Sequence, residues 1–111
     1  MTGRFGSVVT AMVTPLREDH AVDLDRAQEL ARWLIANGSD AIVVAGSTGE
    51  SPTLTQREKA DLFAAVADAI RGQGAMIAGV GTYATAETLE LTHALFRYHF
   101  LARLNLNRLW R

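Results

Sequence analysis

The chain has 111 residues, of which 49% are hydrophobic and 21% charged, with a formal net charge of −1 and no cysteine. Such a composition predicts one folded domain and excludes a disordered chain, a disulfide framework and thiolate metal sites. No apolar stretch approaches the roughly 20 residues that span a bilayer, and the N-terminus lacks a signal-peptide pattern. We therefore expect a cytoplasmic protein that does not bind membranes.

The chain begins with a predicted strand, a helix and a second strand. A β-branched run over residues 7–13 is closed by Pro15, and proline ends strands. Asp23 is suited to cap a helix that Asn37 and Gly38 would end. Residues 41–45 are apolar throughout, as in a parallel strand that is buried on both faces. The helix carries apolar residues at three- and four-residue spacing, namely Ala27, Leu30, Ala31, Leu34 and Ile35.

Two further βα segments follow. Residues 55–58 form a capping box, residues 75–80 predict a third strand, and a third helix begins near Thr85. The strands recur about every 34 residues, and strict alternation of strand and helix predicts a parallel sheet. Two α/β architectures fit, a doubly wound sheet or the N-terminal (βα)3 portion of a TIM barrel, which needs about 250 residues in full. The second helix has one apolar face, formed by Leu62, Phe63, Val66, Ala67 and Ile70.

The loop after the second strand is the strongest candidate for a binding site. Its sequence is Gly-Ser-Thr-Gly-Glu-Ser over residues 46–51, and ligands of α/β proteins lie at the carboxyl ends of such strands. Ser47 and Thr48 could therefore hold a carboxylate with their hydroxyls and the loop amides. The glycine spacing fits neither a P-loop nor a dinucleotide fingerprint. A glycine-rich turn without a ligand remains the alternative reading of these residues alone.

The other candidate catalytic groups have structural explanations. Lys59 is the only lysine and stands in the polar part of the capping-box helix, so we predict a solvated surface residue and no amine nucleophile. His93 and His99 are six residues apart, which is not a chelating spacing on a helix. We therefore expect no metal and no cofactor. Paired acids at the predicted helix starts are explained by the helix dipole, namely Asp23 with Asp25 and Glu87 with Glu90.

Composition changes abruptly near Thr92. Residues 1–92 carry all 12 acids and 7 of the 11 bases, whereas residues 93–111 carry four arginines and no acid. We divide the chain there, into βα units and an aberrant arginine-rich tail that is expected to be helical or disordered. Arginines mixed with aromatic residues also occur in nucleic-acid binders, but we predict no nucleic-acid partner.

Five short segments occur in a specific order. Phe5-Gly-Ser7 precedes the first strand and Val13-Thr-Pro15 closes it; residues 46–55, 77–82 and 84–87 flank the later strands. Together they resemble dihydrodipicolinate synthase (4-hydroxy-tetrahydrodipicolinate synthase), of the pyruvate-dependent class I aldolase superfamily. The resemblance implies a TIM-barrel lyase, homotetrameric at full length, that condenses pyruvate with aspartate semialdehyde through a Schiff base in lysine and diaminopimelate biosynthesis.

The resemblance also assigns roles within the loop. By this match Ser47 belongs to the family's hydroxyl proton relay, and Thr48 binds the pyruvate carboxylate. The family commonly has threonine where Ser47 stands, and Gly-Ser-Thr-Gly-Glu is also typical of N-acetylneuraminate lyases. Such a lyase, or a 2-keto-3-deoxy sugar acid aldolase, is therefore the alternative within the superfamily. The family's Schiff-base lysine lies on its sixth strand and has no counterpart in this sequence.

Feedback-inhibited members of the family bind lysine at a second site. It matches Pro52, Gln56, Lys59, Gly81, Tyr83 and Glu87 here. Only Gly81 and Glu87 keep the family's pattern, and a cationic Lys59 would repel lysine. We expect no inhibition by lysine, even in a full-length version.

The resemblance covers residues 4–92 and ends where the composition changes. We expect a truncated or frameshifted N-terminal fragment that is inactive by itself. Three parallel strands leave two unpaired edges and an apolar face, which predicts an aggregation-prone or molten chain. The alternative from another class of function is a small non-enzymatic module that binds a carboxylate through Ser47 and Thr48.

Overall fold

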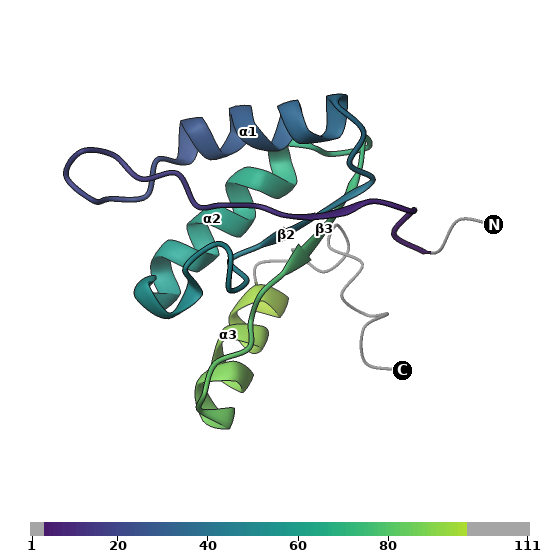
Figure 1. Cartoon of the computed structure of the whole chain (residues 1–111). Helices are drawn as coiled ribbons and strands as arrows, with labels where there is room; N and C mark the ends of the chain where they lie inside the picture. Colours follow the sequence, from purple (N-terminus) through teal and green to yellow (C-terminus); the bar gives the residue numbers. More distant parts are fainter. Residues whose placement is uncertain (1–3, 98–111) are drawn as a thin grey trace.

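Strands and helices alternate along residues 4–97, the part of the chain that the computed structural model describes (Figure 1). This alternation confirms the predicted order of elements. The strands are shorter than the predicted runs, although each lies inside its run. The elements are β1 (Val9–Ala11), α1 (Leu24–Ala36), β2 (Ala41–Val44), the 3-10 helix η1 (Ser51–Thr53), α2 (Gln56–Ala69), β3 (Ala75–Ala78) and α3 (Thr85–Arg97).

The three strands of the described region form one parallel sheet in the order β1-β2-β3. Val43 of β2 lies opposite Ala11 of β1 and Ile77 of β3. Pairing extends slightly past β1, because Met12 N–H donates to the Val43 carbonyl at 3.0 Å. β2 ends where Ala45 takes a left-handed backbone conformation with φ of 53°, which strand pairing does not allow.

α1 begins and ends, and α2 begins, where the sequence predicts. The Asp23 side chain caps α1 by accepting a hydrogen bond from Arg26 N–H, and Asn37 follows the last residue of the helix. At the start of α2, Thr55 and Glu58 form the complete reciprocal capping box, with bonds of 3.1 and 3.0 Å. Local hydrogen bonds therefore set these helix boundaries.

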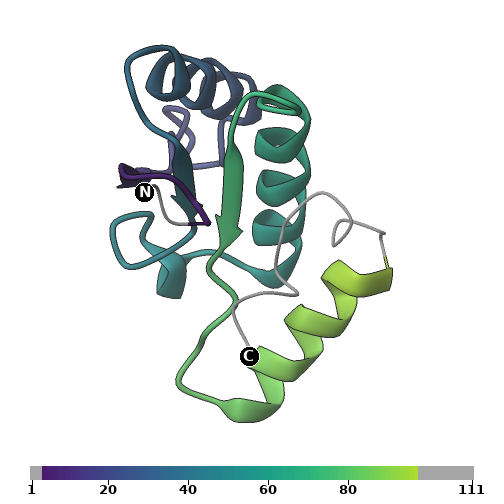
Figure 2. The ribbon, with the colours of Figure 1, turned by 90° about the vertical axis from the view of Figure 1, so that its right-hand side faces the viewer.

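One face of the sheet is covered by helices. Parallel strands joined in the same sense place their connecting helices on one side, and Figure 2 shows α2 lying along β2 and β3 with α1 beside it. Ile42 and Met76 are buried on this face together with the apolar side of α2. Each fully buried side chain of this kind stabilises the fold by about 1.5–3 kcal/mol. All five core positions predicted for this helix are buried, namely Leu62, Phe63, Val66 and Ala67 in α2 and Ile70 directly after it.

The opposite face of the sheet has no helix over it in the described region (Figure 2). Val9 is 45% exposed and Val13, just after β1, is 54% exposed. Val43 and Ile77 are partly exposed on the same face. Within residues 4–97 the sheet therefore has the apolar face and the unpaired edges that three parallel strands predict.

Asp40 joins the beginnings of all three strands. Its carboxylate accepts hydrogen bonds from the N–H groups of Ser7 and Val8, at 2.8 and 2.9 Å. Its own N–H donates to the Val8 carbonyl, and its carbonyl accepts from Ala75 N–H. The bonds from Val8 and Ser7 lower the pKa of the Asp40 carboxyl, because they stabilise its charged form.

The predicted boundary at residue 92 falls within α3. Of the segment 93–111, residues 98–111 lie outside the described part of the chain, and its division from residues 1–92 stays a prediction. Within residues 4–97 no helix has the length and apolar character needed to cross a bilayer.

We expect the uncovered sheet face to drive self-association, because it exposes apolar side chains beside unpaired strand edges. The double substitution Val43→Thr with Ile77→Thr keeps β-branched residues and should shift sedimentation toward the monomer. Trp33→Gln is the control, since Trp33 is 60% exposed but lies on α1. Equal effects of the two changes would contradict this assignment of the surface.

Asp40 should make stability depend on pH. A carboxyl whose pKa is lowered in the folded state contributes stability above its unfolded pKa, and this is lost as the pH falls through the folded value. Asp40→Asn should therefore lower the urea midpoint at pH 7 more than at pH 3, measured at low protein concentration. Glu29→Gln removes only an exposed ion pair with Arg26 and should change the midpoint little at either pH.

Candidate functional site

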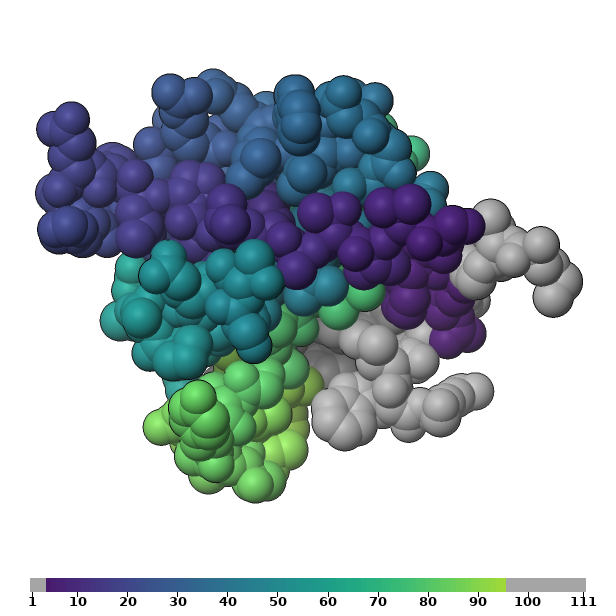
Figure 3. All heavy atoms as spheres, viewed as in Figure 1, coloured from purple at the N-terminus to yellow at the C-terminus, as the bar shows by residue number. Residues whose placement is uncertain are grey.

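The loops after the three strands gather at one edge of the sheet, as the alternating pattern predicts. The buried hydroxyl of Thr14, just beyond β1, donates a 2.7 Å hydrogen bond to the carbonyl of Gly49 in the loop after β2. Gly79, at the end of β3, donates to the Val44 carbonyl at 2.8 Å. In Figure 3 the teal atoms of the loop after β2 lie directly above the green atoms of the loop after β3 and of α3.

The backbone of the loop after β2 is strained at both ends. Ala45 has φ of 53° and Glu50 has φ of 56°, and left-handed conformations of non-glycine residues commonly mark functional loops. Between them, the Gly46 carbonyl accepts hydrogen bonds from Gly49 and Ser51 N–H groups, at 3.1 and 3.3 Å. The loop is therefore a tight, internally bonded turn that leads into η1.

Ser47 and Thr48 lie at the exposed tip of this turn. Neither hydroxyl, and neither N–H group, has a hydrogen-bond partner within residues 4–97. Ser47 contributes only its carbonyl, which accepts from Glu50 N–H at 3.1 Å. The two predicted site residues therefore offer four adjacent donors that a carboxylate could accept.

A cavity of about 870 Å³ opens beside this turn. Ser47 lines it and Thr48 does not, so the structure places only one of the two predicted residues on its wall. The cavity continues between the first turns of α2 and α3. It is lined by all six residues that the resemblance matched to a lysine site, namely Pro52, Gln56, Lys59, Gly81, Tyr83 and Glu87.

The opposite wall is built by the loop after β3. Gly79 has no room for a side chain, because a Cβ atom there would overlap the carbonyl oxygen of Ala45. Thr82 N–H donates to the Thr88 hydroxyl of α3 at 3.0 Å, and the Thr82 hydroxyl bonds Ala84. The Thr82 bonds hold this loop against the start of α3, and the close packing of Gly79 on Ala45 sets it beside the turn after β2.

The predicted surface position of Lys59 is wrong. Lys59 is only 4% exposed and is not a solvated surface residue. It lies three, four and seven residues before Leu62, Phe63 and Val66, and so shares the buried face of α2. Its four-carbon stem can pack against apolar side chains while the ammonium reaches the cavity. This spacing is visible in the sequence, but the polar neighbours Glu58 and Asp61 conceal it.

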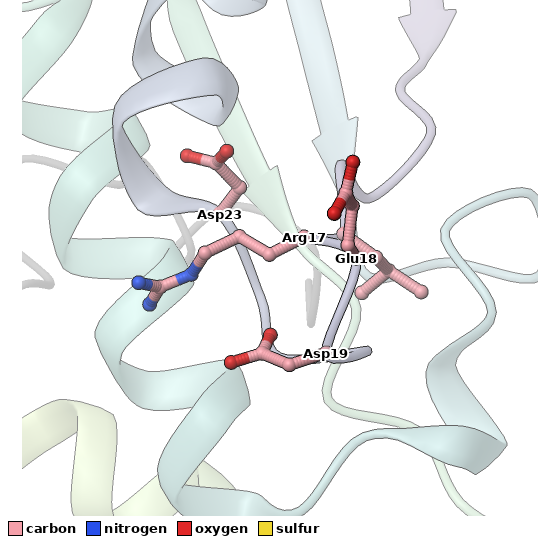
Figure 4. Close-up of a pocket in the computed structure, with 5 residues that line it drawn as sticks. Arg17, Glu18, Asp19 and Asp23 are labelled. Atoms are coloured by element: carbon pink, nitrogen blue, oxygen red, sulfur yellow. The ribbon is translucent and has the colours of Figure 1, made fainter.

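A second, shallower hollow lies in the turn after β1 and is lined by Leu16, Arg17, Glu18, Asp19 and Asp23. Figure 4 shows the Arg17 and Glu18 side chains leaving this turn in different directions. Asp19 accepts a hydrogen bond from Ala21 N–H, Asp23 caps α1, and Arg17 reaches the Val22 carbonyl at 3.4 Å. These side chains stabilise the turn, so we assign no ligand to it.

Comparison with known proteins identifies relatives of the whole described region. A model of the dihydrodipicolinate synthetase family matches residues 4–107. The 4-hydroxy-tetrahydrodipicolinate synthase of Desulforamulus reducens is 52% identical over 88 residues, which are 79% of this chain and 30% of that protein. The synthase of Symbiobacterium thermophilum is 52% identical over 93 residues. The chain thus spans about a third of the length of the curated relatives that it matches.

Solved structures of similar proteins share the fold. A dihydrodipicolinate synthase from Bacillus anthracis has a TM-score of 0.80 and 40% identity, covering 87% of this chain and 33% of that one. An N-acetylneuraminate lyase from Mycoplasma synoviae has a TM-score of 0.77 and 30% identity, covering 86% and 33%. The described strands and helices are therefore the (βα)3 portion of a TIM barrel, as predicted, and not a doubly wound sheet.

The bond from Thr14 to Gly49 should be important for the site's stability. Thr14→Val keeps the shape of the side chain but leaves the buried Gly49 carbonyl without its donor, which costs about 1–3 kcal/mol. Thr53→Val is the control, because its hydroxyl bonds the Glu50 carbonyl in an exposed position, and should cost about 0.5 kcal/mol or less. Urea titration measures both changes, and equal losses would contradict the assignment.

Proposed function

Because the chain belongs to the dihydrodipicolinate synthetase family, we propose that it is the N-terminal part of a 4-hydroxy-tetrahydrodipicolinate synthase. The reaction is the condensation of pyruvate with aspartate semialdehyde through a Schiff base. The observation that carries this proposal is the turn after β2, where Ser47 and Thr48 present donors that have no partners within residues 4–97, at the carboxyl end of a barrel strand. Active sites of TIM barrels lie at this end.

The turn is suited to hold the carboxylate of pyruvate. The hydroxyl of Thr48 and the N–H groups of Ser47 and Thr48 are adjacent donors, and hydrogen bonds to an ionised acceptor are stronger than neutral ones. The strained ends of the turn and the Thr14 bond to Gly49 keep these donors in place before the ligand arrives. Such a preorganised site loses little free energy to reorganisation when the ligand binds.

Ser47 is proposed to pass protons within the hydroxyl relay. A serine hydroxyl can donate one hydrogen bond while it accepts others, so it can hand a proton from one neighbour to the next. The lysine that forms the Schiff base in the family is not among the residues of this chain. We therefore propose that residues 4–92 supply the carboxylate-binding part of the site and none of the covalent chemistry.

The second candidate is an N-acetylneuraminate lyase. It is favoured by the serine at position 47 and by the structural likeness to the Mycoplasma synoviae lyase. The curated relatives at 52% identity carry the synthase name instead. We therefore place the synthase first.

A chimera tests the substrate and the site together. Residues 4–92 would replace the matching third of the Desulforamulus reducens synthase, and turnover would be measured with aspartate semialdehyde and with N-acetylneuraminate. We expect synthase activity, and Thr48→Val should lower kcat/KM about 10–100-fold, since one hydrogen bond to a charged group contributes about 1.5–3 kcal/mol.

Thr53→Val in the same chimera is the matched control, because Thr53 lies in η1 and does not line the cavity. It should leave kcat/KM nearly unchanged. If the chimera turned over N-acetylneuraminate and not aspartate semialdehyde, the synthase proposal would be wrong and the lyase would be favoured. An unchanged kcat/KM in the Thr48→Val chimera would contradict the assignment of Thr48 to the site.

The chain by itself should form no covalent adduct with pyruvate. Borohydride reduction in the presence of pyruvate traps an iminium as a stable mass increase on lysine, and Lys59 is the only lysine available. Lys59 lies in the first turn of α2 rather than on a barrel strand, so we expect no mass increase. A trapped adduct on Lys59 would contradict the proposed inactivity.

A further inference from the structure

Thr14 lies just after β1, outside the turn that carries Ser47 and Thr48, yet it is bonded to that turn. Its side chain is buried, with 6% exposure, and its hydroxyl donates to the Gly49 carbonyl at 2.7 Å. A hydroxyl has a single proton, so in this arrangement none is left to donate to a carboxylate. The influence of Thr14 on a ligand at the turn therefore passes through Gly49.

Gly49 is held through both its N–H and its carbonyl. The N–H donates to the Gly46 carbonyl at 3.1 Å, and the carbonyl accepts from Thr14. A Cβ atom at this position would stand 3.1 Å from the Thr14 hydroxyl and from the Cα atom of Ala45. The glycine therefore fills a narrow space between the Thr14 side chain and the backbone that leaves β2. Without the Thr14 hydroxyl, its buried carbonyl would lack a donor in this space.

The position of Gly49 determines how the donors of the turn are oriented. Ser47 and Thr48 lie between Gly46 and Gly49, and a planar peptide bond joins Thr48 to Gly49. The N–H and hydroxyl groups of Ser47 and Thr48 have no partners within residues 4–97, so no bonds of their own orient them. Their orientation depends on the anchored residues on either side.

We propose that Thr14 is a positioning residue that sets the affinity for the keto acid and not for the aldehyde. Through Gly49 it holds the N–H groups of Ser47 and Thr48 where one carboxylate can accept from both. The inference rests on the proposed function, because it takes pyruvate to be the ligand of the turn. It adds a residue that touches no substrate and acts by keeping the turn preorganised.

This role has a selective kinetic consequence. The carboxylate of pyruvate is not the reacting group, so the turn holds it equally in the ground state and in the transition state. An interaction of this kind changes KM and leaves kcat nearly unchanged. Loss of the Thr14 hydroxyl should therefore raise KM for pyruvate. The KM for aspartate semialdehyde should not change, because the turn is not proposed to hold the aldehyde.

A role in stability alone is the alternative, and Thr10 provides the matched control. Thr10 belongs to β1, and its partly buried hydroxyl bonds the Ser39 hydroxyl at 2.6 Å. Ser39 precedes β2, so this bond lies at the opposite end of the sheet from the turn. Thr10→Val removes a hydrogen bond near the same strand without reaching Gly49.

The kinetic test uses the chimera with the Desulforamulus reducens synthase. Thr14→Val should raise KM for pyruvate about tenfold, since small displacements of positioning groups have large effects. Thr14→Ser keeps the donor and should restore the parent KM, and Thr10→Val should leave it unchanged. The proposal is wrong if Thr14→Val raises both KM values equally, or if Thr10→Val raises KM for pyruvate as much as Thr14→Val does.

Thr48→Val in the same chimera separates this inference from the proposed function. If Thr48→Val lowers kcat/KM and Thr14→Val leaves KM for pyruvate unchanged, the turn binds pyruvate but Thr14 does not position it. If neither variant changes the kinetics with pyruvate, the proposed pyruvate site is itself wrong and this inference fails with it.

Hydrogen exchange of the 111-residue chain tests the positioning step without turnover. Two N–H groups of the turn bond the Gly46 carbonyl, and their exchange reports local opening. Measured by mass spectrometry, a peptide over residues 45–54 should exchange about tenfold faster in Thr14→Val, relative to a peptide from α2. Thr10→Val should not raise this ratio. An unchanged ratio in Thr14→Val would overturn the proposal, whether or not the chimera is active.

Discussion

The central strand β2 is hydrogen-bonded on both sides, and the position of the candidate site follows from that pairing. Asp40 fixes the beginning of the strand to Val8 and to Ala75, and the carbonyls of Val43 and Val44 accept from Met12 and Gly79 at the other end. Because the three strands run parallel in one register, the loops that follow them must lie together. The gathering of Thr14, Ser47 and Thr82 at one edge is therefore a consequence of strand pairing.

The backbones of neighbouring loops approach closely at this edge, and this limits which residue types the loops can contain. Gly79 leaves no space for a side chain beside the Ala45 carbonyl, and a Cβ atom at Gly49 would stand 3.1 Å from the Thr14 hydroxyl. Ala45 and Glu50 accept left-handed conformations that only the surrounding contacts can maintain. The donors of Ser47 and Thr48 are thus presented by a turn that is held from several sides, which suits a binding site better than a freely moving loop would.

Lys59 illustrates how local sequence can mislead. Its neighbours Glu58 and Asp61 are acidic and the segment is a helix start, so the local sequence predicts a solvated position. Its distance from Leu62, Phe63 and Val66 places it on the buried side of α2 instead, and the folding of the loop after β3 then encloses it in a cavity. A charged group on an apolar helix face is informative because burial without a partner is unfavourable.

The sequence by itself determined the order of the elements, the parallel sheet, the caps of α1 and α2 and the family. These depend on periodicity, on capping residues such as Asp23 and Thr55, and on short motifs, all of which are local along the chain. Strand lengths, the enclosure of Lys59 by the loop after β3 and the absence of Thr48 from the cavity wall were decided only by the tertiary structure. They depend on contacts between residues far apart in sequence, such as Thr14 with Gly49 and Ala45 with Gly79, and no local pattern records which of these loops will meet.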